Sequence, residues 1–339
     1  MEENNIILEV KSLKVEFDMR QGKVTAVNDV SFQLKKGKVL AVVGESGSGK
    51  SVTARSLMRI EAPGKITEGE IYFHSDKYGE TEIQNLDSEG EKIRSIRWKE
   101  IAMIFQEPMT SFGPMHTFGN QIAEVVILHD KLNKVEAVEK AIESLRSVGM
   151  PRPEKVINQY PHQISGGMRQ RAMIAMALIC NPKILIADEP TTALDVSTES
   201  QIIDVLIERQ RTLNTSILYI SHNLGVVANI ADEVVVMYLG QIVEHAPVDE
   251  LFSSPKHPYT VALLNSIPRI DKDYHGQKLE VLHGSIPDPY NHPKGCKFHP
   301  RCPKSIIGLC DIIQPLPIDI SPTSSVSCHL YSTSNLKNE

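Results

Sequence analysis

Short, unbroken runs of apolar residues recur along the chain and predict strands that are buried on both faces. The first run is Val39–Val43, and similar runs lie at 184–187, 217–220 and 234–237. A strand of a parallel sheet has this pattern because other layers cover both of its faces. A long amphipathic helix is expected at about 198–213. Strands that alternate with helices predict an α/β fold built on a parallel sheet.

Two further kinds of segment flank these runs. β-branched and alternating apolar residues at 7–17 and 24–34 predict strands near the start of the chain. The segment at about 107–149 is predicted to be helical. The apolar positions at helical spacing in this segment are Val135, Val138, Ala141, Ile142, Leu145 and Val148.

Proline becomes frequent after about residue 251, which predicts a different, loop-rich C-terminal module. We therefore expect a main domain at 1–250 and a C-terminal extension at 251–339. Within the main domain, a helical subdomain is expected at about 107–170.

A glycine-rich turn joins the strand at 39–43 to a helix predicted at about 51–60. Backbone N–H groups and a helix N-terminus in this arrangement point at an anion, and glycine lets the backbone approach a phosphate closely. The lysine and the serine that end such a loop reach the β- and γ-phosphates and a Mg²⁺ ion. A turn that binds nothing is the alternative, and the flanking strand and helix argue against it. The predicted phosphate-binding loop consists of Gly44, Glu45, Ser46, Gly47, Ser48, Gly49, Lys50 and Ser51.

Two carboxylates follow the apolar run at 184–187. At this place Asp188 would lie near the magnesium ion, and Glu189 would polarise the attacking water as a general base. Alone, such a pair is more often the solvated end of a strand. Combined with a phosphate-binding loop it predicts a nucleotide hydrolase, because phosphoryl transfer depends on the placement of charge and water.

A second predicted anion-binding helix start lies at Ser165, a good N-cap residue for the helix that follows. The sequence of residues 163–171, Gln-Ile-Ser-Gly-Gly-Met-Arg-Gln-Arg, resembles the signature of ATP-binding cassettes. The resemblance implies a P-loop ATPase core with an antiparallel β subdomain and an α-helical subdomain. It also implies that Ser165, Gly166 and Gly167 close on the γ-phosphate held by a second ATPase subunit, so that two subunits enclose two ATP molecules.

The other cassette motifs match one residue each. Gln106 matches the glutamine that senses magnesium and the attacking water, and it opens the subdomain that contacts the membrane partner. His222 matches the histidine that contacts the γ-phosphate, and Asp195 matches the loop that crosses between subunits. Phe17 occupies the place of an aromatic residue that stacks on adenine. For Phe17 and His222 the alternative is an ordinary core residue.

The resemblance narrows to the dipeptide and oligopeptide importer group, through the phrase at 187–196 and the C-terminal motifs at 257–260 and 266–268. Met168 in the signature is typical of the D-type ATPase of that group. The resemblance implies peptide uptake through two separate permease subunits, delivery by an extracytoplasmic binding protein, and an F-type ATPase as the second cassette. A nickel or sugar importer of the same group is the alternative.

Composition limits the other classes. The net charge of −6 does not indicate a nucleic-acid binder, and no apolar run approaches the roughly 20 residues that span a bilayer. Together with this composition, the resemblance implies a peripheral subunit at the cytoplasmic face of the cell membrane. A soluble cassette ATPase of DNA repair or translation would carry coiled-coil insertions or two cassettes. An exporter ATPase would lack the extension, and a GTPase would carry an Asn-Lys-x-Asp motif.

Four of the five cysteines lie in the proline-rich extension. In a cytosolic chain such clustering favours a metal over disulfides, and the spacing is looser than in a zinc ribbon. ATPases with a similar extension carry a [4Fe-4S] cluster on four cysteines, and thiolates suit that cluster. Zinc and free or disulfide thiols are the alternatives. The candidate ligands are Cys296, Cys302, Cys310 and Cys328, whereas Cys180 is expected in the core.

Overall fold

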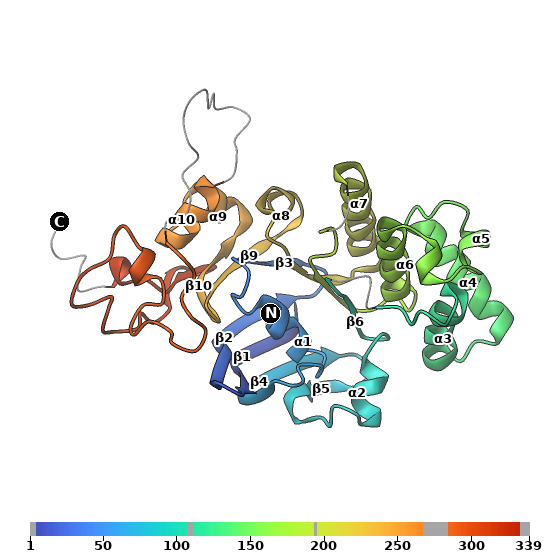
Figure 1. Cartoon of the computed structure of the whole chain (residues 1–339), viewed down its shortest axis with the longest axis horizontal. Coiled ribbons are helices and arrows are strands. Elements are labelled where there is room, and N and C mark those ends of the chain that lie inside the picture. The colour runs from blue at the N-terminus through green and yellow to red at the C-terminus, as the bar shows by residue number, and fades with distance from the viewer. Residues whose placement is uncertain (1–4, 107–110, 193–194, 267–283, 333–339) are drawn as a thin grey trace.

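A computed structural model of the chain describes residues 5–106, 111–192, 195–266 and 284–332. A central eight-stranded sheet runs across the molecule (Figure 1). Its strand order is β11 (Ile318–Ser321), β12 (Ser324–Val326), β10 (Gln241–Pro247), β9 (Glu233–Tyr238), β3 (Val39–Val43), β8 (Ser216–Ile220), β7 (Ile184–Asp188) and β6 (Ile101–Ile104).

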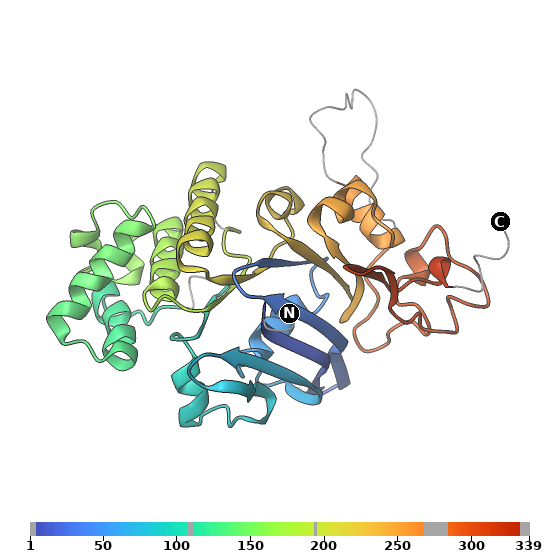
Figure 2. The ribbon, with the colours of Figure 1, turned by 180° about the vertical axis from the view of Figure 1, so that it is seen from behind.

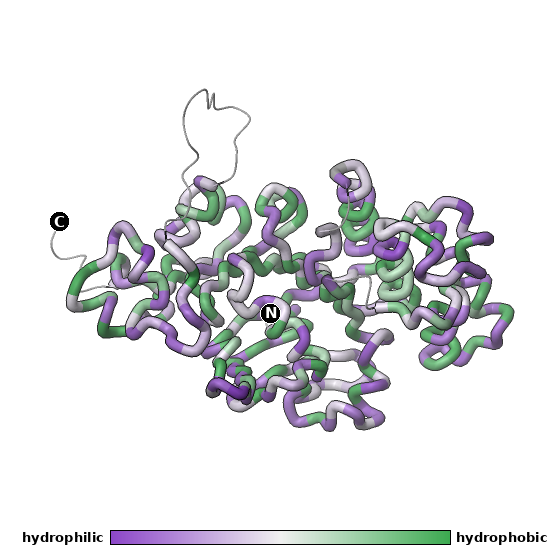
Figure 3. The backbone as a smooth tube through the Cα atoms, viewed as in Figure 1, coloured by the Kyte–Doolittle hydropathy of each residue, from purple (hydrophilic) through white to green (hydrophobic). Residues whose placement is uncertain are grey.

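The strands β9, β3, β8, β7 and β6 are parallel, and they include all four predicted apolar runs. Side chains of β3 alternate between two cores. Val39, Ala41 and Val43 face one apolar cluster, whereas Leu40 and Val42 face the other. Figure 3 shows the most hydrophobic segments along these central strands. The unbroken apolar pattern thus follows from burial on both faces, and the predicted α/β fold with a parallel sheet is confirmed.

An antiparallel four-stranded sheet covers one face of the central sheet. Its strand order is β2 (Gly22–Lys35), β1 (Ile6–Met19), β4 (Lys65–Ser75) and β5 (Gly79–Glu82). The helix α1 (Lys50–Ser56) packs on the same core, and α2 (Glu91–Ile96) lies at its edge. The strands predicted at 7–17 and 24–34 are confirmed. The helix predicted at 51–60 ends earlier, at Ser56, because the chain turns away through Arg59, whose φ is 53°.

Helices lie along the other face and at one end of the molecule. They are α3 (Phe118–Asp130), α4 (Lys134–Ser147), α5 (Pro153–Val156), α6 (Gly166–Leu178), α7 (Val196–Leu213) and α8 (Leu224–Ile230). The group α3, α4 and α5 forms one end of the molecule in both views (Figures 1 and 2). The predicted helical region therefore contains α3 and α4, while its expected start at 107 lies outside the described residues. The predicted long helix at 198–213 is confirmed as α7.

The C-terminal extension continues the central sheet. After α9 (Val248–Ser253) and α10 (Pro258–Asn265), the hairpin of β11 and β12 pairs with β10, with Glu244 opposite Val326. The expected boundary at 250 thus separates strands of one sheet, and the outer ends of the expected domains, residues 1 and 339, lie outside the described residues. The boundary itself stays a prediction. Within the described part of the chain, no helix combines the length and the apolar character that crossing a membrane requires.

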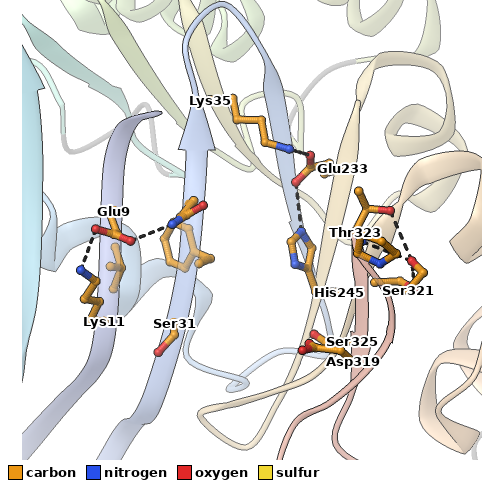
Figure 4. Close-up of a pocket in the computed structure, with 15 residues that line it drawn as sticks. Glu9, Lys11, Ser31, Lys35, Glu233, His245, Asp319, Ser321, Thr323 and Ser325 are labelled. Atoms are coloured by element: carbon orange, nitrogen blue, oxygen red, sulfur yellow. Dashed lines mark hydrogen bonds and ion pairs between the residues drawn. The ribbon is translucent and has the colours of Figure 1, made fainter. Parts of the chain in front are cut away.

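Glu233, at the start of β9, contacts both the antiparallel sheet and the neighbouring strand of its own sheet. Its carboxylate accepts a hydrogen bond from Lys35 at the end of β2, and it lies 3.1 Å from Nε2 of His245 on β10 (Figure 4). A pocket of about 350 Å³ opens between β1, β2 and the C-terminal hairpin at this point. The hydrogen bonds with His245 and Lys35 lower the pKa of Glu233 from its ordinary value of 4.5 to about 2.

We expect Glu233→Gln to lower the free energy of unfolding by about 1 kcal/mol at pH 7, because the amide cannot replace a carboxylate between two donors. Since folding lowers this pKa, the stabilisation is complete above about pH 4.5 and is lost as the pH falls towards 2. Urea unfolding at several pH values should show the difference from wild type shrinking below pH 4.5. Glu89→Gln, at an exposed ion pair with Arg94, is the control. A difference that is constant with pH would contradict the assignment.

Candidate active site

Four neighbouring parallel strands carry the predicted chemical residues at their carboxyl ends. The strand β3 ends directly before the loop at 44–51, and β7 ends at Asp188. The strands β8 and β6 end two residues before His222 and Gln106, respectively. The carboxyl ends of parallel strands lie along one edge of the sheet. These residues, which are distant in the sequence, therefore lie in one row.

The predicted phosphate-binding loop is held by its own lysine. Lys50 Nζ donates hydrogen bonds to the carbonyl oxygens of Gly44, at 2.8 Å, and Glu45, at 3.0 Å. Lys50 is only 6% exposed, and burial lowers its pKa. Gly49 has a φ of 98°, and a Cβ there would lie 2.5 Å from the carbonyl oxygen of Ala26, so only glycine fits. The loop therefore presents a cation on a closely packed backbone.

Ser51 and Asp188 meet below this loop. The Ser51 hydroxyl donates a hydrogen bond to Asp188 Oδ1 at 2.9 Å. Asp188 is 1% exposed, and burial raises the pKa of its carboxyl group. A hydroxyl and a carboxylate are oxygen ligands of the kind that Mg²⁺ prefers, so the residues present fit the expected ion.

Glu189 gathers three side chains on one carboxylate oxygen. Its Oε2 accepts hydrogen bonds from Gln106 Nε2 at 2.9 Å and from the Thr192 hydroxyl at 3.0 Å. His222 Nδ1 lies 3.3 Å from the same atom. The structure thus brings the three predicted catalytic residues together. Thr192 was not predicted, since a threonine after a strand carries no chemical signal of its own.

Glu189 has a φ of 46°, which is unusual for a residue other than glycine. Its backbone N–H donates to the carbonyl of Ile220 on the neighbouring strand, at 2.9 Å. Such strained conformations persist where the surrounding structure imposes them, and they are frequent at active sites.

The signature residues lie at the start of a different helix. Ser165 is the N-cap of α6 and accepts a hydrogen bond from the Met168 N–H at 3.3 Å, so Gly166 and Gly167 form the first turn. Asp195 caps α7 in the same way, and the hydrogen bond from the Thr198 N–H lowers the pKa of its carboxyl group. Within the described residues, no hydrogen bond or ion pair joins Ser165 or Asp195 to the phosphate-binding loop. Residues 193 and 194 of the same motif lie outside the described residues.

Phe17 lies near the end of β1 and is half-buried. Its ring packs against the apolar core and against Gly64, where a Cβ would lie 2.7 Å from Cζ of the ring. Its role in adenine stacking stays a prediction.

The four C-terminal cysteines are free thiols near one another. Burial raises the pKa of Cys296 and Cys328 to about 11, and the neighbouring thiols add to the shift. No group of three or more His, Cys, Asp or Glu side chains in the described ranges is arranged to hold a metal ion. The iron–sulfur prediction therefore finds no support in this arrangement. Cys180 is buried in the core, as predicted.

Similarity to known proteins decides the family. Residues 27–192 match the ABC transporter family model, and residues 243–310 match the model of the oligopeptide/dipeptide transporter C-terminal region. The oligopeptide transport ATP-binding protein AppD of Bacillus subtilis is 48% identical over 328 residues, which cover 96% of this chain and 97% of AppD. The chain belongs to the ABC transporter ATP-binding family. This cassette is therefore an ATPase.

Other relatives agree. The oligopeptide transport ATP-binding protein OppD of Bacillus subtilis is 50% identical and covers 86% of this chain and 80% of its own length. OppD of Salmonella typhimurium is 46% identical, over 92% of this chain and 90% of its own. Among solved structures, a dimeric ATP-binding cassette bound to ADP and Pi in a post-hydrolysis state aligns with a TM-score of 0.64 and 25% identity. It covers 71% of this chain and 98% of its own, which confirms the cassette fold.

We expect Lys50→Ala to weaken ATP binding at least about a hundredfold, because it removes a buried cation from the phosphate-binding loop. Titration with a fluorescent ATP analogue measures the effect. Lys134→Ala, at an exposed residue that opens α4, should bind ATP like the wild type. Wild-type affinity in a folded Lys50→Ala variant would contradict the assigned loop.

Proposed function

We propose that this cassette is the ATP-hydrolysing motor of an importer for dipeptides or oligopeptides. The observation that carries the proposal is the match of residues 243–310 to the C-terminal region of oligopeptide/dipeptide transporters. The identity of 46 to 50% with proteins named as oligopeptide transport ATP-binding proteins supports it. An importer of nickel or sugars is the alternative, since recognition of the cargo would rest with other subunits.

The geometry at Glu189 supports a hydrolytic mechanism. A water molecule attacks the γ-phosphorus, the bond from that phosphorus to the β–γ bridging oxygen breaks, and ADP and phosphate result. Glu189 accepts the proton of the attacking water, while Gln106 and His222 hold its carboxylate in place. Ser51, Asp188 and Gln106 would hold a Mg²⁺ ion, which would supply positive charge to the phosphates.

The signature residues are assigned to the ATP of a second cassette. Ser165 and Asp195 cap α6 and α7, and the alignment with a dimeric ATP-binding cassette bound to ADP and Pi supports an action of both residues on a partner subunit. The partner is proposed to be an F-type paralogue, which makes the motor a heterodimer. Lys50 and Glu189 of this chain would then form one half of one closed site, and the signature residues of this chain would form one half of the other.

The permease is proposed to dock in a groove of about 660 Å³ beside the segments that flank Gln106. One wall is Trp98, just before β6, and the other is α3, with Glu124 and Leu128. Leu128 is 67% exposed, so its apolar side chain is accessible to an occupant of the groove. An occupant of this groove would touch the chain on both sides of Gln106 and so couple membrane movement to the active site. The cassette would thus be peripheral to the cytoplasmic face of the membrane, with a binding protein delivering peptide outside.

We expect tagged Glu189→Gln protein, trapped with ATP and purified from gently solubilised membranes, to bring down two permease chains and a second cassette. The amide cannot accept the proton of the water, so ATP stays bound and the closed dimer accumulates. Mass spectrometry identifies the chains, and an ATPase assay should show turnover reduced about a hundredfold or more.

Adding Leu128→Glu to this variant should remove the permease but keep the second cassette and bound ATP. Glu143→Gln, on the exposed face of α4, is the matched control. Normal turnover in Glu189→Gln would contradict the general-base role. Recovery of ribosomes or nucleic acid in place of permease chains would contradict the transport role.

We also propose that Cys296, Cys302, Cys310 and Cys328 take up a [4Fe-4S] cluster, although their side chains do not form a metal-holding group as placed. The proposal starts from the chemistry of the residues: thiolates suit such a cluster, and a metal would stabilise a loop-rich segment. Anaerobically purified protein should contain iron and absorb as a brown protein, and Cys328→Ser should lose both. Cys180→Ser should keep them. Zinc instead of iron, or no metal, would contradict the proposal.

A further inference from the structure

Glu45, the second residue of the phosphate-binding loop, is bound by side chains of the C-terminal extension. Arg301 lies in a short 3₁₀ helix, His299–Arg301, and its side chain is only 4% exposed. Its two terminal nitrogens donate to the two carboxylate oxygens of Glu45, at 2.7 and 3.1 Å. This bidentate ion pair joins residues that are 256 positions apart in the sequence.

A second residue of the extension, Tyr259, binds the backbone of Glu45. The Tyr259 hydroxyl, from α10, accepts a hydrogen bond from the Glu45 N–H at 2.8 Å. The Tyr259 ring packs against Tyr238 and Phe298, with ring centroids 4.7 and 5.3 Å apart, and Arg301 also donates to the Tyr238 hydroxyl at 3.3 Å. The side chains that bind Glu45 are therefore part of a packed aromatic cluster and not an isolated surface contact.

Glu45 needs such a partner because of where it lies. Its carbonyl accepts the hydrogen bond of Lys50, and its neighbours in the loop face the triphosphate. An unpaired carboxylate at this place would repel the phosphates, whereas a carboxylate paired with a guanidinium would not. The bidentate pair also fixes the start of the loop, whose shape decides where the backbone N–H groups point.

We propose that Arg301 is a positioning residue for ATP. It neutralises the charge of Glu45, and together with Tyr259 it makes the ATP affinity of the phosphate-binding loop depend on the C-terminal extension. This inference rests on the proposed role of residues 44–51. It gives the extension a direct function in nucleotide binding, besides any contact with other subunits.

The test is the effect of Arg301→Met in the full-length chain on binding of ATP, ADP and adenosine, by isothermal titration. We expect the Kd for ATP to rise roughly tenfold, that for ADP to rise less, and that for adenosine to stay unchanged, since repulsion by Glu45 grows with phosphate charge. The KM for ATP should rise with little change in kcat. Adding Glu45→Gln to Arg301→Met should recover most of the lost affinity, and Arg301→Lys should lose less than Arg301→Met.

Arg146→Met removes an exposed ion pair with Glu154 and should leave nucleotide binding unchanged. Lys50→Ala tests the assignment of the phosphate-binding loop separately from the role of Arg301. Wild-type ATP affinity in Lys50→Ala overturns the loop assignment. With that assignment intact, an unchanged ATP affinity in Arg301→Met, or an equal loss for adenosine and ATP, overturns the role of Arg301. If Arg301→Met does not fold, Arg301→Lys and Tyr259→Phe are measured instead. Unchanged ATP affinity in both of these folded variants overturns it equally.

Discussion

The pairing of four parallel strands is the constraint on which the active site depends. Val42 of β3 lies beside Ile220 of β8, Ile220 lies beside Asp188 of β7, and Ala187 lies beside Ile104 of β6. This register aligns the four carboxyl ends in one row. A shift by one residue would turn every buried side chain to the opposite face, so the apolar packing on both faces fixes the register. The same packing therefore holds together the fold and the chemical groups.

Several charged groups lie close together at the row of strand ends, and the chain alone does not provide enough opposite charge for them. Burial raises the pKa of Asp188 and lowers that of Lys50, so it disfavours the charged form of both groups. Glu189 adds a further carboxylate beside them. A magnesium ion and a triphosphate would supply the missing opposite charges, which is why this arrangement suits a binding site better than it suits a purely structural edge. The electrostatic cost in the free chain becomes binding free energy for the nucleotide.

What could be predicted from the sequence was local. The strand at 39–43 and the loop after it have a short-range pattern, because burial on both faces and the approach of phosphate each require particular neighbouring residues. The strands β11 and β12 are short and partly polar, so no periodicity marks them. The helix α1 was predicted too long, since helix propensity does not report the turn at Arg59.

Contacts between residues that are far apart in the sequence could not be predicted from it. Arg301 is one arginine in a proline-rich segment, and nothing around it indicates that it reaches Glu45. Lys35 and Glu233 are likewise separated by 198 positions. Conversely, Gln106 and His222 could be assigned from motifs, yet their meeting on one oxygen of Glu189 follows only from the strand order. Sequence motifs therefore predicted the chemical groups, while the sheet topology determines which of them lie together.

The geometry of the signature helix explains how so little covalent chemistry can move a membrane protein in the proposed dimer. The first N–H groups of a helix have no acceptor within the helix, and Ser165 satisfies only that of Met168. Gly166 and Gly167 therefore offer donors to a phosphate, but the phosphate-binding loop of the same chain makes no described contact with them. An ATP that bridges two chains would supply that phosphate and hold them closed. In the proposed dimer, cleavage of the γ-phosphate would remove the group that both chains bind, and the two cassettes would then separate.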